Sequence, residues 1–460
     1  MSEFGHGLPA RRRFWAMLAV CCGTVLAVLD GAIVTVALPT LARVLHVRSS
    51  DAVLVVSVYQ LVLVMALLPF SALGQRIGLR RLYQYGQVLF VISTTLCFFT
   101  HSLPLLLVVR ALQALGGAAS LSVSTALIRS IYPPSHLGRG LAIHTVVVSS
   151  SNALAPIIGG ALLSIASWPW LFAAAAPLAL ASLAIGHRML PDPEVRNEPY
   201  DVLGAVLCAL TFGLIISGLE GATHGDSPAV AAVAVAAGAL VAIVFARREL
   251  RSRLPILPVD LLGSPVLALS AGSALLVFIG SMCFLLSLPF RLQHQFGYTP
   301  AQVGAIITPW PVSMMLVAPM AGLLSDRFPA AILGGLGMGI AAAGLLLMAF
   351  VPADVTHLGL AWRMTLCGAG FGLFSAPNAR LIVHAAPLHR AASAGGLIST
   401  TRLTGQTLGA TLMAGLLALG FGADRTPALI AAALSVTAGL GSVARLKARA
   451  IKVPAGPALE

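Results

Sequence analysis

Charged residues are scarce in this chain of 460 residues. Only 9% are Asp, Glu, Lys or Arg, whereas 58% are hydrophobic and the mean hydropathy is +0.94. A water-soluble protein of this length must present polar groups over most of its surface, so the composition excludes a soluble globular domain. A bilayer instead requires apolar segments of about 20 residues whose backbone groups are hydrogen-bonded internally. The sequence therefore predicts an all-α membrane protein.

Lysine is nearly absent, because only Lys447 and Lys452 accompany the arginines. Neither follows a glycine, which excludes a G-x-x-x-x-G-K-[ST] phosphate-binding loop and ATP hydrolysis through it. Neither lies in an apolar segment, which excludes a Schiff-base photoreceptor. The arginines cluster between apolar segments, as the positive-inside rule describes, so the net charge of +13 does not indicate nucleic-acid binding.

Metal and disulfide patterns are also missing. The cysteines form no C-x-x-C pair, and no His or acidic cluster of the kind that a membrane-embedded acyl- or prenyltransferase needs is visible. Cysteines inside apolar segments are typical of small buried side chains. We therefore expect no enzyme, no metal and no cofactor. All six cysteines lie in such segments: Cys21, Cys22, Cys97, Cys208, Cys283 and Cys367.

Fourteen apolar segments are long enough to cross a bilayer. The first follows Arg11–Arg13 but has no cleavage site, so we expect it to be retained. Most arginines lie in the tail and in the loops of one side, which predicts that both termini are cytoplasmic and that the protein spans the bacterial inner membrane many times. The predicted spans are 14–38, 52–73, 82–100, 104–130, 139–165, 168–187, 201–219, 227–246, 263–288, 300–324, 330–351, 358–383, 393–420 and 427–445.

Short motifs recur at an offset of about 250 residues. Leu38-Pro39 recurs as Leu288-Pro289, and Arg110 corresponds to Arg363. Two parallel six-helix halves around a central site are typical of transporters. We expect an N-terminal half over 1–190, an inserted helix pair with its flanking loops over 191–260, and a C-terminal half with a basic tail over 261–460.

Asp30 is the one acid deep inside an apolar segment, where a carboxylate is costly and usually marks an ion path. Depth along the helices places Arg110 in the same layer, because each residue adds about 1.5 Å. Tyr59 and Gln60 reach a similar depth, and Gln113 lies on the same helix face as Arg110. We predict that Asp30 and Arg110 form the proton-coupling site, in which Asp30 exchanges the proton and Arg110 tunes that exchange. The alternatives are a packing role for Asp30 and, for Arg110, a clamp on backbone carbonyls.

Four motifs together resemble the signatures of the major facilitator superfamily. The fourteen spans with an inserted pair resemble that family's drug:proton antiporters along nearly the whole chain. The motifs are Leu73-Gly-Gln75-Arg76-Ile-Gly78, Arg110-x-x-Gln113-x-x-Gly116-Gly117, Ala155-Pro156-Ile-Ile-Gly159-Gly160, and Asp30 in Leu29-Asp30-Gly31-Ala32-Ile33-Val34.

The resemblance implies a major facilitator fold, a cytoplasmic gate and an antiporter motif. Gln75, Ser71 and Ala155 depart from the family pattern, which has Asp, Gly and Gly there. The implied gate residues belong to the loops after the second and the tenth predicted spans and are Gln75, Arg76, Gly78, Arg80, Arg81, Asp326 and Arg327. The implied antiporter motif comprises Asn152, Ala155, Pro156, Gly159 and Gly160.

The substrate predicted on this basis is an amphipathic drug or toxic small molecule, exported by a monomer in exchange for protons. Aromatic and Met side chains suit such substrates, although ordinary bundle packing also explains them. The alternatives are a dedicated exporter of a metabolite, lipid or siderophore, and an uptake symporter. The predicted substrate-binding residues are Tyr59, Gln60, Gln113, Trp310, Met314, Phe371, Phe374 and Asn378.

Overall fold

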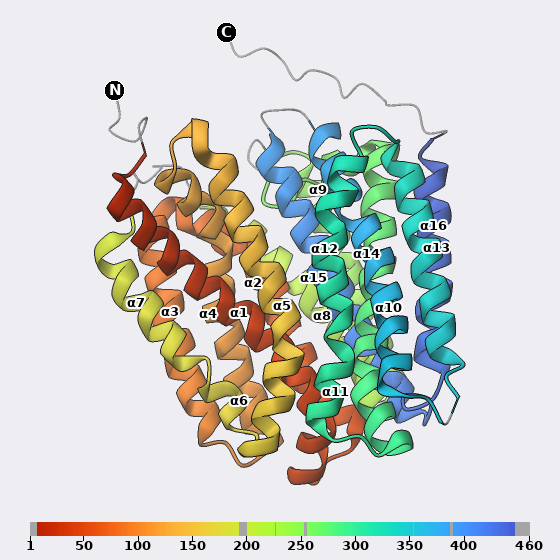
Figure 1. Ribbon diagram of the computed structural model, residues 1–460. Coiled ribbons are helices and arrows are strands. Elements are labelled where there is room, and N and C mark those ends of the chain that lie inside the picture. Colours follow the sequence, from red (N-terminus) through yellow and green to blue (C-terminus); the bar gives the residue numbers. More distant parts are fainter. Residues whose placement is uncertain are drawn as a thin grey trace.

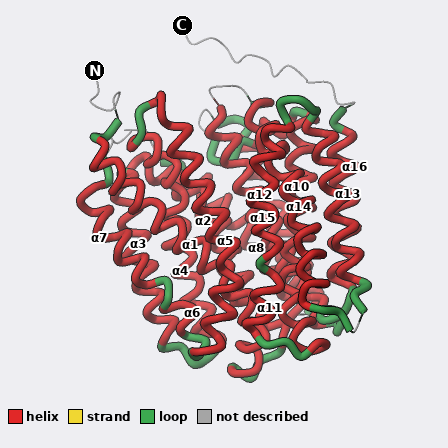
Figure 2. Tube along the Cα trace, viewed as in Figure 1, coloured by secondary structure: helices red, strands yellow, loops and turns green. Residues whose placement is uncertain are grey.

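The computed structural model describes residues 7–192, 200–225, 227–252, 255–352, 354–386 and 390–446, without the side chains of Pro134, His224, Ala391 and Ala392. Its regular elements are all helical, and no strand occurs in these residues (Figure 2). The α-helices are α1 (Ala10–Val44), α2 (Ser49–Ile77), α3 (Leu79–Phe98), α4 (Leu103–Ile131), α5 (Leu137–Ile165), α6 (Trp170–Ala173), α7 (Ala176–Met189), α8 (Val202–His224), α9 (Pro228–Glu249), α10 (Pro265–Phe296), α11 (Pro300–Ile307), α12 (Pro309–Leu324), α13 (Ala330–Ala349), α14 (His357–Ala385), α15 (Ala391–Ala418) and α16 (Thr426–Ala444).

Twelve helical segments in the described residues are long and apolar enough to cross a membrane, with α6–α7 and α11–α12 each counted as one. The more polar α3 and α15, of 20 and 28 residues, are not among them. Large apolar side chains such as Val108, Val233 and Leu440 are 59 to 68% exposed, a surface that lipid tails solvate and water does not. The all-α multi-pass prediction is confirmed, and the count of fourteen spans stays a prediction.

Several helices extend beyond the predicted spans. The first two spans correspond to α1 and α2, which reach Val44 and Ile77. Gln75 and Arg76 therefore lie in the last turn of α2, and the prediction that they belong to a loop was wrong. Hydropathy detects only the apolar part of a helix, whereas the backbone ladder continues through polar residues.

Two predicted spans are interrupted helices. The span 300–324 divides into α11 and α12 at Thr308 and Pro309. Pro309 has no N–H to continue the hydrogen-bond ladder, while the Thr308 hydroxyl donates to the Gly304 carbonyl at 2.7 Å. The span 168–187 likewise divides into α6 and α7, with Pro177 in the first turn of α7.

Helix packing follows the internal repeat. In the first repeat α1 packs against α5 and α7, and α4 against α2 and α3. In the second, α10 packs against α15 and α16, and α14 against α12 and α13. The two sets lie beside one another along their length (Figure 1).

The helices between the repeats, α8 and α9, pack on each other, and α8 also contacts α2 and α15. The inserted pair thus touches one helix of each repeat. The domain boundaries at 190 and 260 stay a prediction.

One extensive apolar core joins both repeats. It contains Ile33 of α1, Val53 of α2 and Ala155 of α5 together with Met282 of α10 and Met413 of α15, all at most 7% exposed. These residues lie toward the ends of the helices that are remote from the chain termini. The repeats are therefore held together firmly at that end of the bundle.

Candidate functional site

Asp30 lies near the middle of α1 beside Arg110 of α4. Nη1 of Arg110 is 2.5 Å from Oδ2 of Asp30. Gln113, one turn along α4, donates from Nε2 to Asp30 Oδ1 at 3.1 Å and accepts from Arg110 Nη1 at 2.6 Å. All three residues have no solvent exposure. The predicted proximity of Asp30 and Arg110 is confirmed, and Gln113 closes the hydrogen-bonded ring.

Aromatic rings and a backbone carbonyl enclose this guanidinium. Cζ of Arg110 lies 4.2 Å from the centre of the Tyr59 ring and 5.3 Å from that of Phe172. Arg110 Nε donates to the carbonyl of Val55 at 3.3 Å. The Tyr59 hydroxyl donates to the Ala27 carbonyl at 3.1 Å, which fixes the ring over Arg110. Arg110 therefore combines the two roles considered from the sequence, because it pairs with Asp30 and also donates to a backbone carbonyl.

The charge arrangement makes the ion pair sensitive to protonation. A buried ion pair that water does not reach is stable only while both groups are charged. Removal of one partner typically destabilises the protein by about 3–5 kcal/mol, because the other charge stays buried without compensation. A proton that adds to Asp30 removes the counter-charge of Arg110, whose Nη2 already has no hydrogen-bond partner among the described residues. Protonation of one carboxyl can therefore change how α1 and α4 hold together.

Two members of this cluster were missed by sequence reasoning. Thr94 of α3 accepts a hydrogen bond from Gln113 Nε2 at 2.9 Å, and Phe172 of α6 lies against Arg110. The polar run Ser93-Thr94-Thr95 inside an apolar segment was a signal for the first. No sequence signal distinguishes Phe172 from other apolar residues.

The second repeat does not duplicate the cluster. Arg363, the counterpart of Arg110, donates to the Gly359 carbonyl of its own helix at 2.6 Å and lies over the Trp362 ring at 4.7 Å. Gly280 occupies the position of Asp30, and a Cβ there would lie 3.2 Å from the Ala431 backbone. The buried acid–arginine pair therefore belongs to one repeat only.

The gate residues predicted after the second span lie at the turn between α2 and α3. Gly78 lies between the last residue of α2 and the first residue of α3. Its φ of 103° is a backbone conformation that residues other than glycine rarely adopt. Arg80 donates to the His187 carbonyl at the end of α7. Arg76 and Arg81 are exposed.

The corresponding turn of the second repeat holds an ion pair. Nη1 of Arg380, in α14, lies 2.5 Å from Oδ1 of Asp326, and the same nitrogen donates to the Ser325 hydroxyl at 2.8 Å. Arg327 beside it is exposed. Gln75, the counterpart of Asp326 in the first repeat, carries no charge, so it cannot form an ion pair of this kind.

The α5 motif lies where three helices approach closely. A Cβ at Gly159 would come within 2.9 Å of the Ile33 carbonyl of α1, and one at Gly160 within 2.5 Å of the Pro300 carbonyl of α11. Gly304 of α11 faces the Pro156 carbonyl, only 2.2 Å from such a Cβ. Ala155 is fully buried, and Asn152 donates to the Val148 carbonyl of its own helix at 3.1 Å. Gly160 and Gly304 therefore form a tight seam between the repeats, and Gly159 lets α1 pack closely beside it.

The aromatic substrate candidates lie together inside the second repeat. The rings of Trp310 and Phe371 are 4.6 Å apart, and Phe374 belongs to the same buried cluster, against which Met314 packs. The three rings are at most 4% exposed. In this conformation they form a packed core.

Asn378, one turn beyond Phe374 on α14, belongs to a polar cluster near the end of α16. It accepts from Arg445 Nη1 at 2.6 Å and donates to the Ser270 carbonyl at 3.2 Å. Arg445 also donates to the hydroxyls of Ser270 and Ser442. The contact made by Asn378 here is therefore a tie between α10, α14 and α16.

Two polar contacts between segments far apart in the chain were also missed. The Ser150 hydroxyl of α5 lies 3.6 Å from the Met315 sulfur of α12, at the junction of the repeats. Glu220 of α8, 7% exposed, accepts from the Thr411 hydroxyl of α15 at 3.3 Å. Both depend on helix packing that residue spacing does not reveal.

Comparisons with known proteins extend over nearly the whole chain. The sequence profile of the Major Facilitator Superfamily matches residues 20–410 and 267–456. The chain is 44% identical over 410 residues to the uncharacterized transporter YebQ of Escherichia coli K12, covering 89% of this chain and 90% of that protein. It is 31% identical over 424 residues to the tetracenomycin C resistance and export protein of Streptomyces glaucescens, with 89% and 77% covered.

The fold is also that of a solved transporter structure. A bacterial homologue of the human lysosomal transporter Spinster, in an inward-facing and unoccupied conformation, matches with a TM-score of 0.70 at 18% identity, covering 97% of this chain and all of that one. With its repeated bundle and its profile match, this chain belongs to the major facilitator superfamily of membrane transporters.

Proposed function

We propose that this protein is a proton-coupled exporter that moves amphipathic drugs or toxic small molecules out of the cytoplasm by alternating access. The observation that carries the proposal is the fully buried pair of Asp30 and Arg110 inside a membrane-spanning bundle. Ionisable groups in that environment typically mark ion pathways. The similarity to a protein named for tetracenomycin C resistance and export supports the direction and the substrate class.

The proton step uses Asp30 directly. In the outward-open state a proton from outside adds to the carboxylate, and the neutral acid no longer balances the charge of Arg110. The guanidinium keeps its contact with the Val55 carbonyl and the Tyr59 ring while α1 and α4 shift. In the inward-open state the proton leaves to the cytoplasm, the ion pair forms again, and a substrate molecule binds in its place.

The seam around Gly159, Gly160 and Gly304 would close the outer side. Under the proposed topology, the α5–α11 contact lies toward the outside, and backbone approaches this close exclude a passage between those helices. The contact between Ser150 and Met315 lies deeper, where α5 meets α12. We place the substrate path beside that contact, with Tyr59, Gln60 and Gln113 on the first repeat and Met314 next to Met315 on the second.

The function is tested with purified protein in liposomes that carry an imposed pH gradient and an internal pH-sensitive dye. A panel of lipophilic cations, anions and neutral aromatic compounds is added, and an exchanged substrate should dissipate the gradient only when the protein is present. Failure of every compound in the panel would contradict the drug-exporter proposal and favour the dedicated exporter. Movement of substrate in the same direction as the proton would show a symporter.

Reporter fusions test the topology. Because arginines cluster on one side, a cytoplasmic reporter fused near residue 192, 255 or 390 should be active, and a periplasmic reporter should be active near 46, 224 or 424. A cytoplasmic location near 224 would contradict both the fourteen-span arrangement and the inserted pair.

The two gate turns should differ in their sensitivity to loss of an acid. Asp326→Asn removes the charge that pairs with Arg380, whereas Gln75→Asn removes none. We expect the first substitution to lower the transport rate more than the second, measured at equal membrane abundance. The effect should be modest, because Asp326 and Arg380 are 55% and 42% exposed and such pairs contribute about 1 kcal/mol or less. Equal rates in both variants would show that charge does not latch this gate.

A further inference from the structure

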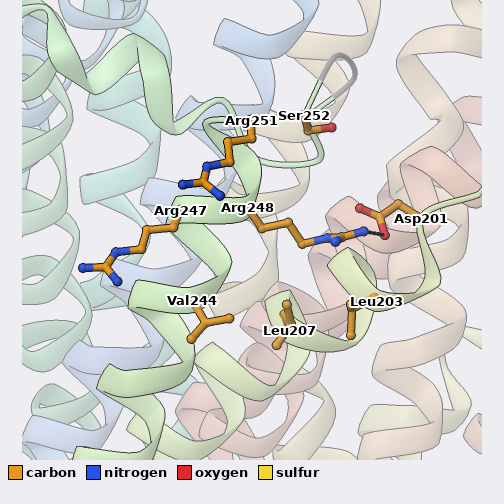
Figure 3. A pocket seen from close by; sticks show the side chains of 8 residues that line it. All are labelled: Asp201, Leu203, Leu207, Val244, Arg247, Arg248, Arg251 and Ser252. Carbon is orange, nitrogen blue, oxygen red and sulfur yellow. Dashed lines mark hydrogen bonds and ion pairs between the residues drawn. The ribbon is translucent and has the colours of Figure 1, made fainter.

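A pocket of about 640 Å³ lies where the first turns of α8 meet the last turns of α9 (Figure 3). One part of its lining is polar, with Arg247, Arg248 and Arg251 opposite Asp201. The pocket is separate from the Asp30 cluster, since none of its lining residues belongs to α1 or α4. The transport cycle proposed above gives it no role.

The other part of the lining is aliphatic. Leu203 and Leu207 lie one turn apart on α8, and Val244 precedes Arg247 by one turn on α9. These three side chains lie on the membrane side of the arginines, because both helices continue from here as apolar spans. The pocket therefore changes from cationic to apolar over about one helical turn, as the boundary between headgroups and acyl chains does.

Asp201 holds one arginine in place. Arg248 Nη2 lies 2.9 Å from Asp201 Oδ1, which also accepts from the Gly204 N–H at 2.9 Å and so caps α8. Partial burial by itself would raise the pKa of Asp201. The hydrogen bonds from Arg248 and Gly204, with the charge of Arg248, outweigh burial, so this pKa lies below its usual value and the carboxylate is charged at neutral pH.

Arg247 and Arg251 remain available for a ligand. They are four residues apart, and both point away from Asp201 (Figure 3). Both are exposed, and neither forms an ion pair with another residue that the structure describes. The pocket lining therefore carries two more positive than negative charges. The excess is one if Glu249 is also counted, although its carboxylate is buried and accepts from the Leu257 N–H at 2.8 Å.

We propose that this pocket binds an anionic phospholipid of the cytoplasmic leaflet, with Arg247 and Arg251 on the phosphate and Leu203, Leu207 and Val244 along the first acyl methylenes. The proposal depends on the cytoplasmic location of this end of α9. Charge complementarity favours the anionic headgroup, and the aliphatic lining favours a lipid over a free phosphate ion. The positive-inside rule accounts for arginines at this level but not for an apolar pocket beneath them.

A bound lipid would connect the inserted pair to the transporter core. The phosphate would hold the end of α9, Arg248 and Asp201 link that end to the start of α8, and α8 packs against α2 and α15. Both repeats therefore contact the helix that the lipid stabilises.

Native mass spectrometry of the delipidated full-length protein, titrated with phosphatidylglycerol or zwitterionic phosphatidylcholine, tests the site. We expect one phosphatidylglycerol to bind in preference, and the double variant Arg247→Gln/Arg251→Gln to lose at least about tenfold in affinity, since two charge-assisted contacts disappear. The matched control Arg11→Gln/Arg188→Gln removes two exposed cytoplasmic arginines outside the pocket and should bind as the unaltered protein does. Leu207→Ser should weaken lipid binding without changing the charge.

Three results would overturn the inference. Equal loss of binding in both double variants would show attraction by overall charge, and no loss in either would show that lipid binds elsewhere. Competition by inorganic phosphate as strong as that by phosphatidylglycerol would identify a free anion as the ligand. If the double variant does not fold, lipid binding by the single variant Arg251→Gln is compared with that by the single control Arg188→Gln. The results that would overturn the inference are then the same. Because binding is the readout, it is independent of whether the protein exports drugs.

Discussion

Asp30→Asn is expected to abolish substrate accumulation driven by a pH gradient. The amide is nearly the same size as the carboxyl but does not exchange a proton at physiological pH, so chemistry is removed with little change in shape. Asp30→Glu should keep part of the activity, because a carboxylate remains at nearly the same depth. The measurement is the uptake of added substrate into inverted vesicles with ΔpH as the only driving force.

The Asp30→Asn variant is also expected to be less stable than the unaltered protein. Arg110 contacts Asp30 at 2.5 Å without solvent, so the Asn variant leaves a buried positive charge without its partner, which typically costs about 3–5 kcal/mol. The thermal midpoint should therefore fall. The double variant Asp30→Asn/Arg110→Gln removes both charges and should recover part of that loss while remaining uncoupled.

The control for Asp30 is Asp260→Asn. This substitution also removes an acid paired with an arginine, Arg390, but at the end of the bundle and partly exposed. Transport should stay close to that of the unaltered protein. The role of Asp30 in coupling would be refuted by a well-folded Asp30→Asn protein that still concentrates substrate with ΔpH alone. Glu220, buried beside Thr411, would then be the next acid to test.

Gly304→Ala is expected to prevent closure of the outer seam. The added Cβ would lie 2.2 Å from the Pro156 carbonyl and 3.4 Å from the Gly160 Cα, so α11 must move away from α5. Overpacking of this kind costs roughly 1–3 kcal/mol, which shifts a two-state equilibrium by about 5- to 150-fold. The variant should populate the outward-open state and export substrate more slowly.

Accessibility from the outside measures this shift. Ile33 is fully buried against the seam, so Ile33→Cys in a background without the six native cysteines should resist an impermeant maleimide when Gly304 is present. It should react in the Gly304→Ala variant. Gly339→Ala on α13 is the matched control, because a Cβ there meets no atom within 4 Å. Identical labelling with and without Gly304→Ala would mean that this seam does not close the outer side.

The sequence alone determined the membrane class, the repeat and the partner of Asp30. These follow from quantities that one helix carries by itself: the length of its apolar run, the position of a charge along it, and the offset of a motif from its copy. The rise per residue relates sequence position to depth, which is why Asp30 and Arg110 could be placed in one layer before their helices were seen to touch.

Only the tertiary structure decided which face of each helix lies against which neighbouring helix. Asn378 was predicted to bind substrate together with Phe371 and Phe374, yet its side chain hydrogen-bonds to Arg445 at the end of α16, while the ring of Phe371 packs against Trp310. Apolarity in a membrane span is nearly uniform around the helix, so it carries little information about facing. The contact of Thr94 with Gln113, the α5–α11 seam and the pocket between α8 and α9 depend on how the helices tilt and approach one another, which close packing between distant segments determines.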